Sequence, residues 1–132
     1  MSEIARVSGH PFVIGEKQRL GDRNVVVSLP DLARFRGYTA VIIDDVIASG
    51  QTILKCIETL REKQIDAISC AAVHGIFSDN SDKQLIQKGL KELVVSNSIA
   101  YTSTLDLMTS GFKTLDLSDL LLKPVQECLT SL

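Results

Sequence analysis

One stretch, residues 38–52 (YTAVIIDDVIASGQT), constrains the fold of this chain more than any other. An apolar run at 41–43 ends in two adjacent carboxylates, Asp44 and Asp45, and a few small residues then lead into a helical pattern that begins at Gln51. Short apolar runs of this kind are typical of buried strands, and the pattern that follows has helical spacing. The order therefore predicts a buried strand, an acidic pair, a tight turn and a helix.

The turn after the acidic pair has the properties of an anion-binding site. Ala48, Ser49 and Gly50 are small, so they leave the backbone N–H groups accessible. N–H groups at a helix N-terminus lack acceptors within the helix and lie at the positive end of its dipole. The hydroxyls of Ser49 and Thr52 can add donors. The alternative is an ordinary strand-to-helix turn, because Asp, Ser and Gly are common in turns.

The rest of the chain continues the alternation of strand and helix patterns. Ile53, Leu54, Ile57 and Leu60 follow the helical period, and the apolar run at 66–73 then predicts the second strand of a parallel β-α-β unit. We therefore expect an α/β fold with a mostly parallel central sheet flanked by helices. Further strands are predicted at 12–14, 24–28, 90–96 and 114–117, and further helices at 2–8, 81–88 and from 118 onward.

Two helix starts carry specific expectations. Ser81 is expected to cap the helix that follows it. Ser118 and Asp119 form a start signal for the final helix. Pro124 lies six residues beyond that signal. An internal proline costs a helix about 3 kcal/mol, so we expect either a kink or a true helix start near Lys123.

Composition limits the class of protein. A chain of 132 residues with 45% hydrophobic and 23% charged residues fits one compact domain, residues 1–132. It has no apolar run of about 18 residues and no signal-peptide pattern, so we expect a cytoplasmic protein without a membrane partner. The formal net charge of −2 argues against a general nucleic-acid binder. Lys and Arg exceed Asp and Glu only in residues 1–37, by six to four.

The cysteines and histidines offer little to a metal site. Cys56, Cys70 and Cys128 are widely spaced in apolar patterns, which predicts buried free thiols in a reducing compartment. With only His10 and His74 as imidazoles, a structural zinc site has few ligands to draw on. His74 follows a predicted strand, where it is either a ligand or acid–base group or, as we favour, a hydrogen-bonded turn histidine.

Residues 16–23 (EKQRLGDR) form a charged segment that contains Gly21 and lacks apolar periodicity. This pattern predicts a flexible loop at the tip of a hairpin-like excursion, with 24–28 as the returning strand. Lys17 and Arg19, two residues apart, are able to close over a polyphosphate and stabilise charge that develops there. The alternative is a solvated hairpin tip, which a charge run alone favours.

The run VIIDDVIASGQT is similar to the phosphoribosyl pyrophosphate motif of type I phosphoribosyltransferases and of ribose-phosphate diphosphokinases. The likeness to the diphosphokinases extends along nearly the whole chain, through FVIGEKQRLGDRNVVV, VIIDDVIASGQT, AAVHGIFSDNS, ELVVSNSI and TLDLSDLL in that order. This resemblance implies a phosphoribosyltransferase-like fold. It also implies the C-terminal domain of a two-domain, homo-oligomeric enzyme whose other half carries most of the ATP site.

The resemblance also implies a role for each matching residue. Lys17 and Arg19 stand at the catalytic loop, while Asp44 and Asp45 stand where the family's acids face the ribose hydroxyls and their metal ion. The implied reaction transfers pyrophosphate from Mg²⁺-ATP to ribose 5-phosphate, giving phosphoribosyl pyrophosphate and AMP. The residues at the position of the 5-phosphate loop are Ala48, Ser49, Gly50, Gln51 and Thr52.

Two residues of that loop depart from the family's pattern. Ala48 replaces an Asp or a hydroxyl residue and Gln51 stands where Gly is common, so we expect weakened binding through the remaining backbone amides.

The sequence leaves three functional hypotheses. The first is a ribose 5-phosphate-binding diphosphokinase domain that is inactive alone. The second is a stand-alone phosphoribosyltransferase, although no segment is left to form an acceptor-binding hood. The third is a non-catalytic, ribose-phosphate-binding regulatory subunit, against which Lys17 and Arg19 count.

Overall fold

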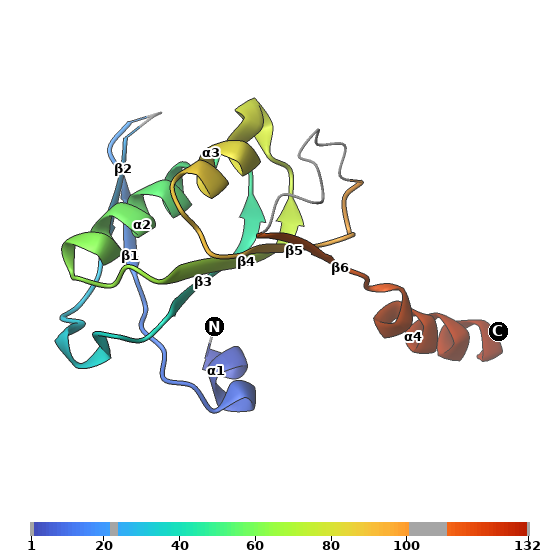
Figure 1. Cartoon of the computed structure of the whole chain (residues 1–132). Coiled ribbons are helices and arrows are strands. Elements are labelled where there is room, and N and C mark those ends of the chain that lie inside the picture. The colour runs from blue at the N-terminus through green and yellow to red at the C-terminus, as the bar shows by residue number, and fades with distance from the viewer. Residues whose placement is uncertain (1, 22–23, 101–110, 132) are drawn as a thin grey trace.

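A computed structural model describes residues 2–21, 24–100 and 111–131 of the chain (Figure 1). The described elements are α1 (Ser2–Ser8), β1 (Glu16–Arg19), β2 (Val25–Ser28), the 3-10 helix η1 (Ala33–Phe35), β3 (Ala40–Ile47), α2 (Gln51–Glu62), β4 (Ile68–Gly75), the 3-10 helix η2 (Ser78–Asn80), α3 (Ser81–Gln87), β5 (Leu93–Ser96), β6 (Phe112–Leu115) and α4 (Ser118–Thr130). From the third strand onward they alternate between strands and helices up to β5, which is followed by β6 and a final helix.

The central sheet has four parallel strands in the order β3-β4-β5-β6. Its register places Ile42 opposite Cys70 and Leu93 opposite Phe112. Parallel neighbours need crossover connections, which are nearly always right-handed, and α2 and α3 accordingly lie on the same side of the sheet (Figure 1). The predicted α/β fold with a mostly parallel sheet and flanking helices is confirmed. Its geometry brings the carboxyl ends of the strands to one edge.

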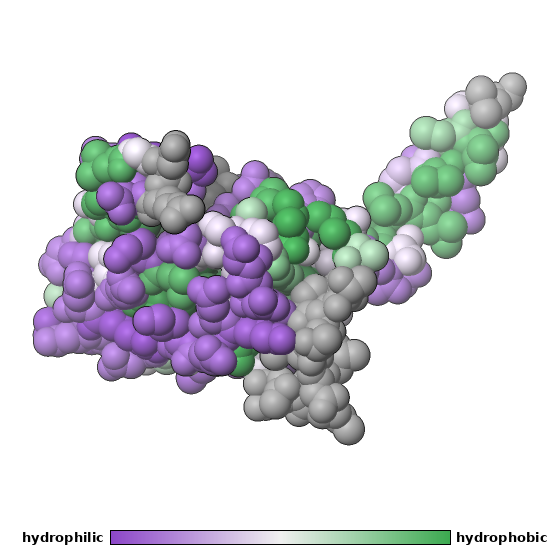
Figure 2. Space-filling view, turned by 90° about the horizontal axis from the view of Figure 1, so that it is seen from above, coloured by the Kyte–Doolittle hydropathy of each residue, from purple (hydrophilic) through white to green (hydrophobic). Residues whose placement is uncertain are grey.

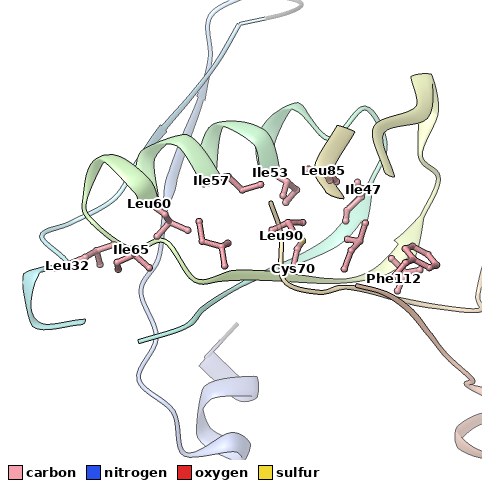
Figure 3. Packing of buried hydrophobic residues seen from close by; sticks show 13 residues of the cluster. Leu32, Ile47, Ile53, Ile57, Leu60, Ile65, Cys70, Leu85, Leu90 and Phe112 are labelled. Carbon is pink, nitrogen blue, oxygen red and sulfur yellow. The ribbon is translucent and has the colours of Figure 1, made fainter. Parts of the chain in front are cut away.

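The hydrophobic core lies between α2, α3 and the sheet (Figure 3). Ile53, Ile57 and Leu60 recur at helical spacing and are 2%, 1% and 6% exposed, so one stripe of α2 is buried along its length. The strands meet that stripe with Ile68 and Cys70, both fully buried. The two helices are also joined near their carboxyl ends, where the Arg61 guanidinium donates to the Lys88 carbonyl oxygen.

The hairpin expected before the main sheet is present, but its strands differ from the prediction. β1 and β2 pair antiparallel with Lys17 opposite Val27, so residues 16–19 form a strand where a loop was predicted. The predicted strand at 12–14 was wrong, since these residues adopt no regular structure. Every residue of β1 is exposed, so this strand depends on backbone pairing and leaves no apolar alternation to read in the sequence. Asp22 and Arg23 of the tip lie outside the described residues.

The start of α4 is fixed by side chains just before it. One oxygen of Asp116 accepts the Ser118 N–H at 2.9 Å and the Asn97 side-chain amide at 2.8 Å. The Asn97 side-chain oxygen in turn accepts the Leu117 N–H at 3.0 Å. The helix therefore begins at Ser118, and the alternative start near Lys123 was wrong. Pro124 lies inside the helix.

Helix α4 extends away from the sheet (Figure 1), and apolar side chains line it (Figure 2). The exposed large apolar residues of this helix are Leu120, Leu121, Leu122, Val125 and Leu129. Cys128, predicted to be buried, is exposed for the same reason. None of the helices in the described part of the chain combines the length and the apolar character needed to cross a membrane.

Replacing Ile57 by Ala is expected to lower the free energy of unfolding by about 2–4 kcal/mol, because the substitution leaves a cavity under α2. Leu121→Ala is the matched control on α4. Leu121 is 56% exposed, so its truncation should change stability by less than about 0.5 kcal/mol. Urea denaturation followed by far-ultraviolet circular dichroism measures both. An equal loss for the two variants would show that α4 is packed against the domain.

Candidate functional site

The polar residues singled out in the sequence meet at the carboxyl edge of the sheet. Asp44 and Asp45 lie near the end of β3, and the turn 48–52 follows directly and leads into α2. In the neighbouring strand, His74 stands opposite Val46. This is the edge at which open parallel sheets of α/β proteins bind ligands.

The turn 48–52 adopts the geometry that its small residues predicted. Gly50 has φ +73°, in the left-handed region that favours glycine, and it lies just before the first residue of α2. The first helical hydrogen bond runs from the Leu54 N–H to the Gly50 carbonyl oxygen at 2.9 Å. The N–H groups of residues 51–53 therefore lie at the open end of a 12-residue helix, where an anion is favoured. Ala48, Ser49 and Gln51 are exposed.

The turn is fixed by hydrogen bonds from the connection after β4 and from the first residue of α3. The Ser81 hydroxyl donates to the Ala48 carbonyl oxygen at 2.7 Å. The N–H groups of Ile76 and Phe77 donate to the Ile47 carbonyl oxygen at 2.9 and 3.1 Å. Ser81 was expected to cap α3, and that prediction was wrong: the cap position is Asn80, without a side-chain cap bond. The hydroxyl is used instead by the neighbouring turn, a contact that nothing in the local sequence indicates.

Asp44 and Asp45 interact with each other, and their pKa values shift in opposite directions. Partial burial is the main cause that raises the pKa of Asp44, and hydrogen bonding with Asp45 adds to the rise. The pKa of Asp45 is lowered, first by hydrogen bonding with Asp44 and then by the Val46 N–H, which donates to its carboxylate at 2.9 Å. A proton on the pair therefore resides on Asp44. Two carboxylates in this arrangement would be relieved of mutual repulsion by a cation or by hydroxyl donors.

The two cations proposed for catalysis lie on β1, two residues apart. Lys17 is near enough to Asp44 for its charge to lower the pKa of that carboxyl, against the larger effect of burial. Arg19 lies further toward the tip of the hairpin and is exposed. The hairpin rests on α2, because the Thr59 hydroxyl donates to the Val27 carbonyl oxygen at 3.4 Å. The structure thus places the charge of Lys17 near Asp44, and catalytic roles for Lys17 and Arg19 both stay predictions.

His74 has a hydrogen-bonded position at the same edge. Its Nδ1 lies 2.7 Å from the Ser98 hydroxyl oxygen, as the favoured interpretation expected, although the residue lies in β4 and not in a turn. Its charge makes a minor contribution to the lowered pKa of Asp45. The imidazole is therefore part of the electrostatic surroundings of the acidic pair.

The cysteines are free, and the two at the core are poor nucleophiles. Burial raises the pKa of Cys70 to about 12 and also raises the pKa of Cys56. The nucleophile and metal ligand is the thiolate, which is scarce at neutral pH for such groups. The groups available for chemistry at the carboxyl edge of the sheet are therefore carboxylates, hydroxyls, backbone N–H groups and an imidazole.

A divalent cation fits the acidic pair only if other ligands complete its shell. Within residues 2–21, 24–100 and 111–131, no three His, Cys, Asp or Glu side chains gather in a way that could hold a metal ion. Mg²⁺ commonly binds one or two carboxylates and takes its remaining ligands from water and substrate phosphates. Asp44 and Asp45 supply that number of carboxylates and the like-charge interaction that a cation relieves.

Known proteins similar to this chain share one activity in their names. The phosphoribosyl synthetase-associated domain matches residues 28–130. A ribose-phosphate pyrophosphokinase from Thermoplasma acidophilum is 31% identical over 76% of this chain and 34% of its own length. One from Ureaplasma parvum serovar 3 is 32% identical over 79% of this chain and 31% of its own length. The chain therefore spans about a third of the length of these curated relatives.

A solved structure agrees with these relatives. The crystal structure of phosphoribosylpyrophosphate synthetase from Mycobacterium smegmatis superposes with a TM-score of 0.79 at 25% sequence identity. The match covers 98% of this chain and 41% of the other. The parallel sheet, the turn after β3 and the preceding hairpin therefore lie within a fold that a known protein shares.

Asp44→Asn is expected to raise the melting temperature at neutral pH, because the raised pKa means that the folded state disfavours the ionised carboxylate. The advantage should shrink as pH falls through the pKa of Asp44 and vanish below about pH 4, where the carboxyl is protonated in the folded and unfolded states alike. Asp45→Asn is the control with the opposite sign, because the lowered pKa of Asp45 contributes stability above the unfolded value. Thermal denaturation between neutral pH and about pH 4 measures both variants. If Asp44→Asn does not raise the melting temperature at neutral pH, the raised pKa of Asp44 is contradicted.

Proposed function

The chain belongs to the ribose-phosphate pyrophosphokinase family, whose phosphoribosyl synthetase-associated domain spans residues 28–130, and we propose that it is the ribose 5-phosphate-binding domain of such an enzyme. The intact protein would transfer pyrophosphate from ATP to ribose 5-phosphate, forming phosphoribosyl pyrophosphate and AMP. The chain of 132 residues would be its C-terminal domain.

One observation supports this proposal above the others: an acidic pair and an open helix end lie next to each other in a single strand-to-helix connection. The turn 48–52 presents backbone N–H groups and the hydroxyls of Ser49 and Thr52, which suit a phosphate. Asp44 and Asp45 present acceptors a few residues away, which suit the hydroxyls of a sugar. A sugar phosphate carries both kinds of group.

The proposed reaction is an in-line displacement at phosphorus. The 1-hydroxyl oxygen of ribose 5-phosphate bonds to the β-phosphorus of ATP, the bond from that phosphorus to the oxygen bridging to the α-phosphate breaks, and AMP leaves with its electron pair. The proton of the hydroxyl is released to solvent, so the products are phosphoribosyl pyrophosphate, AMP and H⁺. Mg²⁺, when bound, would neutralise charge on the polyphosphate, and Asp44 and Asp45 are the residues that would hold it. Lys17 and Arg19 would stabilise charge that develops as the bond breaks.

The departures at Ala48 and Gln51 are compatible with this role. Both side chains are exposed, although Gln51 is the first residue of α2. Ala48 supplies no side-chain donor, and the proposed binding therefore depends on the amides and on two hydroxyls. We propose that the intact enzyme is a homo-oligomer, as the resemblance implies, and that it is cytoplasmic.

Ribose 5-phosphate is expected to bind the wild-type chain, and a Ser49→Ala/Thr52→Ala double variant should bind it about tenfold or more weakly, because two hydroxyl donors are lost. Isothermal titration calorimetry measures both affinities. Ser118→Ala is the matched control, since it removes an exposed hydroxyl at another helix start. Equal affinity in the wild type and the double variant would rule out the turn 48–52 as the phosphate site.

The isolated chain is expected to release no AMP from ATP and ribose 5-phosphate, because the relatives are about three times as long and the proposed ATP contacts lie in their other half. A coupled assay for AMP, with and without Mg²⁺, measures this. Turnover by the isolated chain that is lost in Lys17→Ala would show that these 132 residues hold a complete active site.

A further inference from the structure

We propose that Ser81 is a positioning residue that orients the peptide between Ala48 and Ser49 for anion binding. This inference rests on the proposed function, because it concerns the same phosphate site. Ser81 is the first residue of α3 and lies outside the signature stretch 38–52. It is fully buried, and its hydroxyl donates to the Ala48 carbonyl oxygen at 2.7 Å.

The direction of that hydrogen bond determines the direction of the next N–H group. In a trans peptide the carbonyl of one residue and the N–H of the following residue point in opposite directions. No cis peptide occurs among the described residues, so the Ala48–Ser49 peptide is trans. The Ala48 carbonyl points inward to the buried Ser81, and the Ser49 N–H therefore points outward from the turn.

The outward side of the turn is where the proposed phosphate would lie. Ala48 and Ser49 are exposed, while Gly50 is buried against α3. With the opposite orientation, the Ala48 carbonyl would face the site and repel an anion, and the Ser49 N–H would be buried. Ser81 thus favours the one peptide orientation that adds a donor to those of the helix end.

Packing supports the same arrangement. A Cβ atom at Gly50 would lie 3.1 Å from the Ser81 Cβ and 3.5 Å from the Leu85 Cδ1. The backbone of the turn is therefore seated directly on Ser81, and the hydroxyl reaches the carbonyl without an intervening group. The residue at position 81 has to be small and has to donate a hydrogen bond, which Ser satisfies.

The test compares three chains labelled with ¹⁵N: wild type, Ser81→Ala and Ser96→Ala. Ser96 is the matched control, because it is also a buried serine, 7% exposed, whose hydroxyl donates to a backbone carbonyl oxygen, that of Val73, at 2.6 Å. Ribose 5-phosphate and inorganic phosphate are the probes. Binding is followed by the amide resonance of Ser49 and by calorimetry, and thermal denaturation gives the stability of each chain.

Ser81→Ala is expected to weaken ribose 5-phosphate binding about fivefold to tenfold and to reduce the shift of the Ser49 amide on titration. Ser96→Ala should lose similar stability yet bind as the wild type does. Ser81→Cys keeps the size and a weak donor, so it should bind with intermediate affinity and serves if Ser81→Ala does not fold.

The outcomes separate this inference from the proposed function. Two results would overturn the positioning role and leave the proposed function standing. One is a Ser81→Ala affinity for ribose 5-phosphate that equals the wild-type affinity. The other is a loss of affinity in Ser96→Ala as large as that in Ser81→Ala. A wild-type chain that binds neither probe would overturn both. The inference is supported if Ser81→Ala binds both probes more weakly and the shift of the Ser49 amide is reduced only in the Ser81 variants.

Discussion

Helix α2 buries Ile53, Ile57 and Leu60 against the two strands that flank it in sequence, β3 and β4. Because the strands are parallel and the connection crosses over one face, the helix has to start where β3 ends. This packing brings an acidic strand end and a positive helix end together at the same edge. The hydrophobic stripe of α2 is thus the reason why two features of opposite electrostatic character lie within a few residues of each other.

The same edge holds a carboxylate, that of Asp44, that does not favour the folded state. Burial of Asp44 disfavours its ionised form, and Asp45 lies beside it. Stability alone would select an amide or an apolar residue at such a strand end. An unfavourable carboxylate close to an open helix end is typical of a site whose groups are arranged for a ligand, since perturbed pKa values concentrate at functional sites.

Periodicity and turn chemistry in the sequence were sufficient for the main part of this architecture. The apolar run before Asp44, the helical spacing after Gly50 and the strand that follows predict the parallel unit, because each signal is local. The hairpin was harder to predict, because β1 depends on backbone pairing and has no apolar pattern in the sequence. The strand predicted at 12–14 was wrong. The start of α4 at Ser118 was predicted, and the alternative start near Lys123 was wrong because Asp116 and Asn97 fix the first turn through hydrogen bonds to Ser118 and to each other.

The contact between Ser81 and Ala48 joins two successive strand-to-helix connections that are 33 residues apart in sequence. A turn held in this way loses its conformational freedom when the chain folds, not when a ligand arrives. The entropy of ordering the backbone then no longer opposes association, and the free energy gained from each amide contact appears more fully as affinity. The proposed sugar phosphate can make only a few contacts, so it would gain most from a turn that is already ordered.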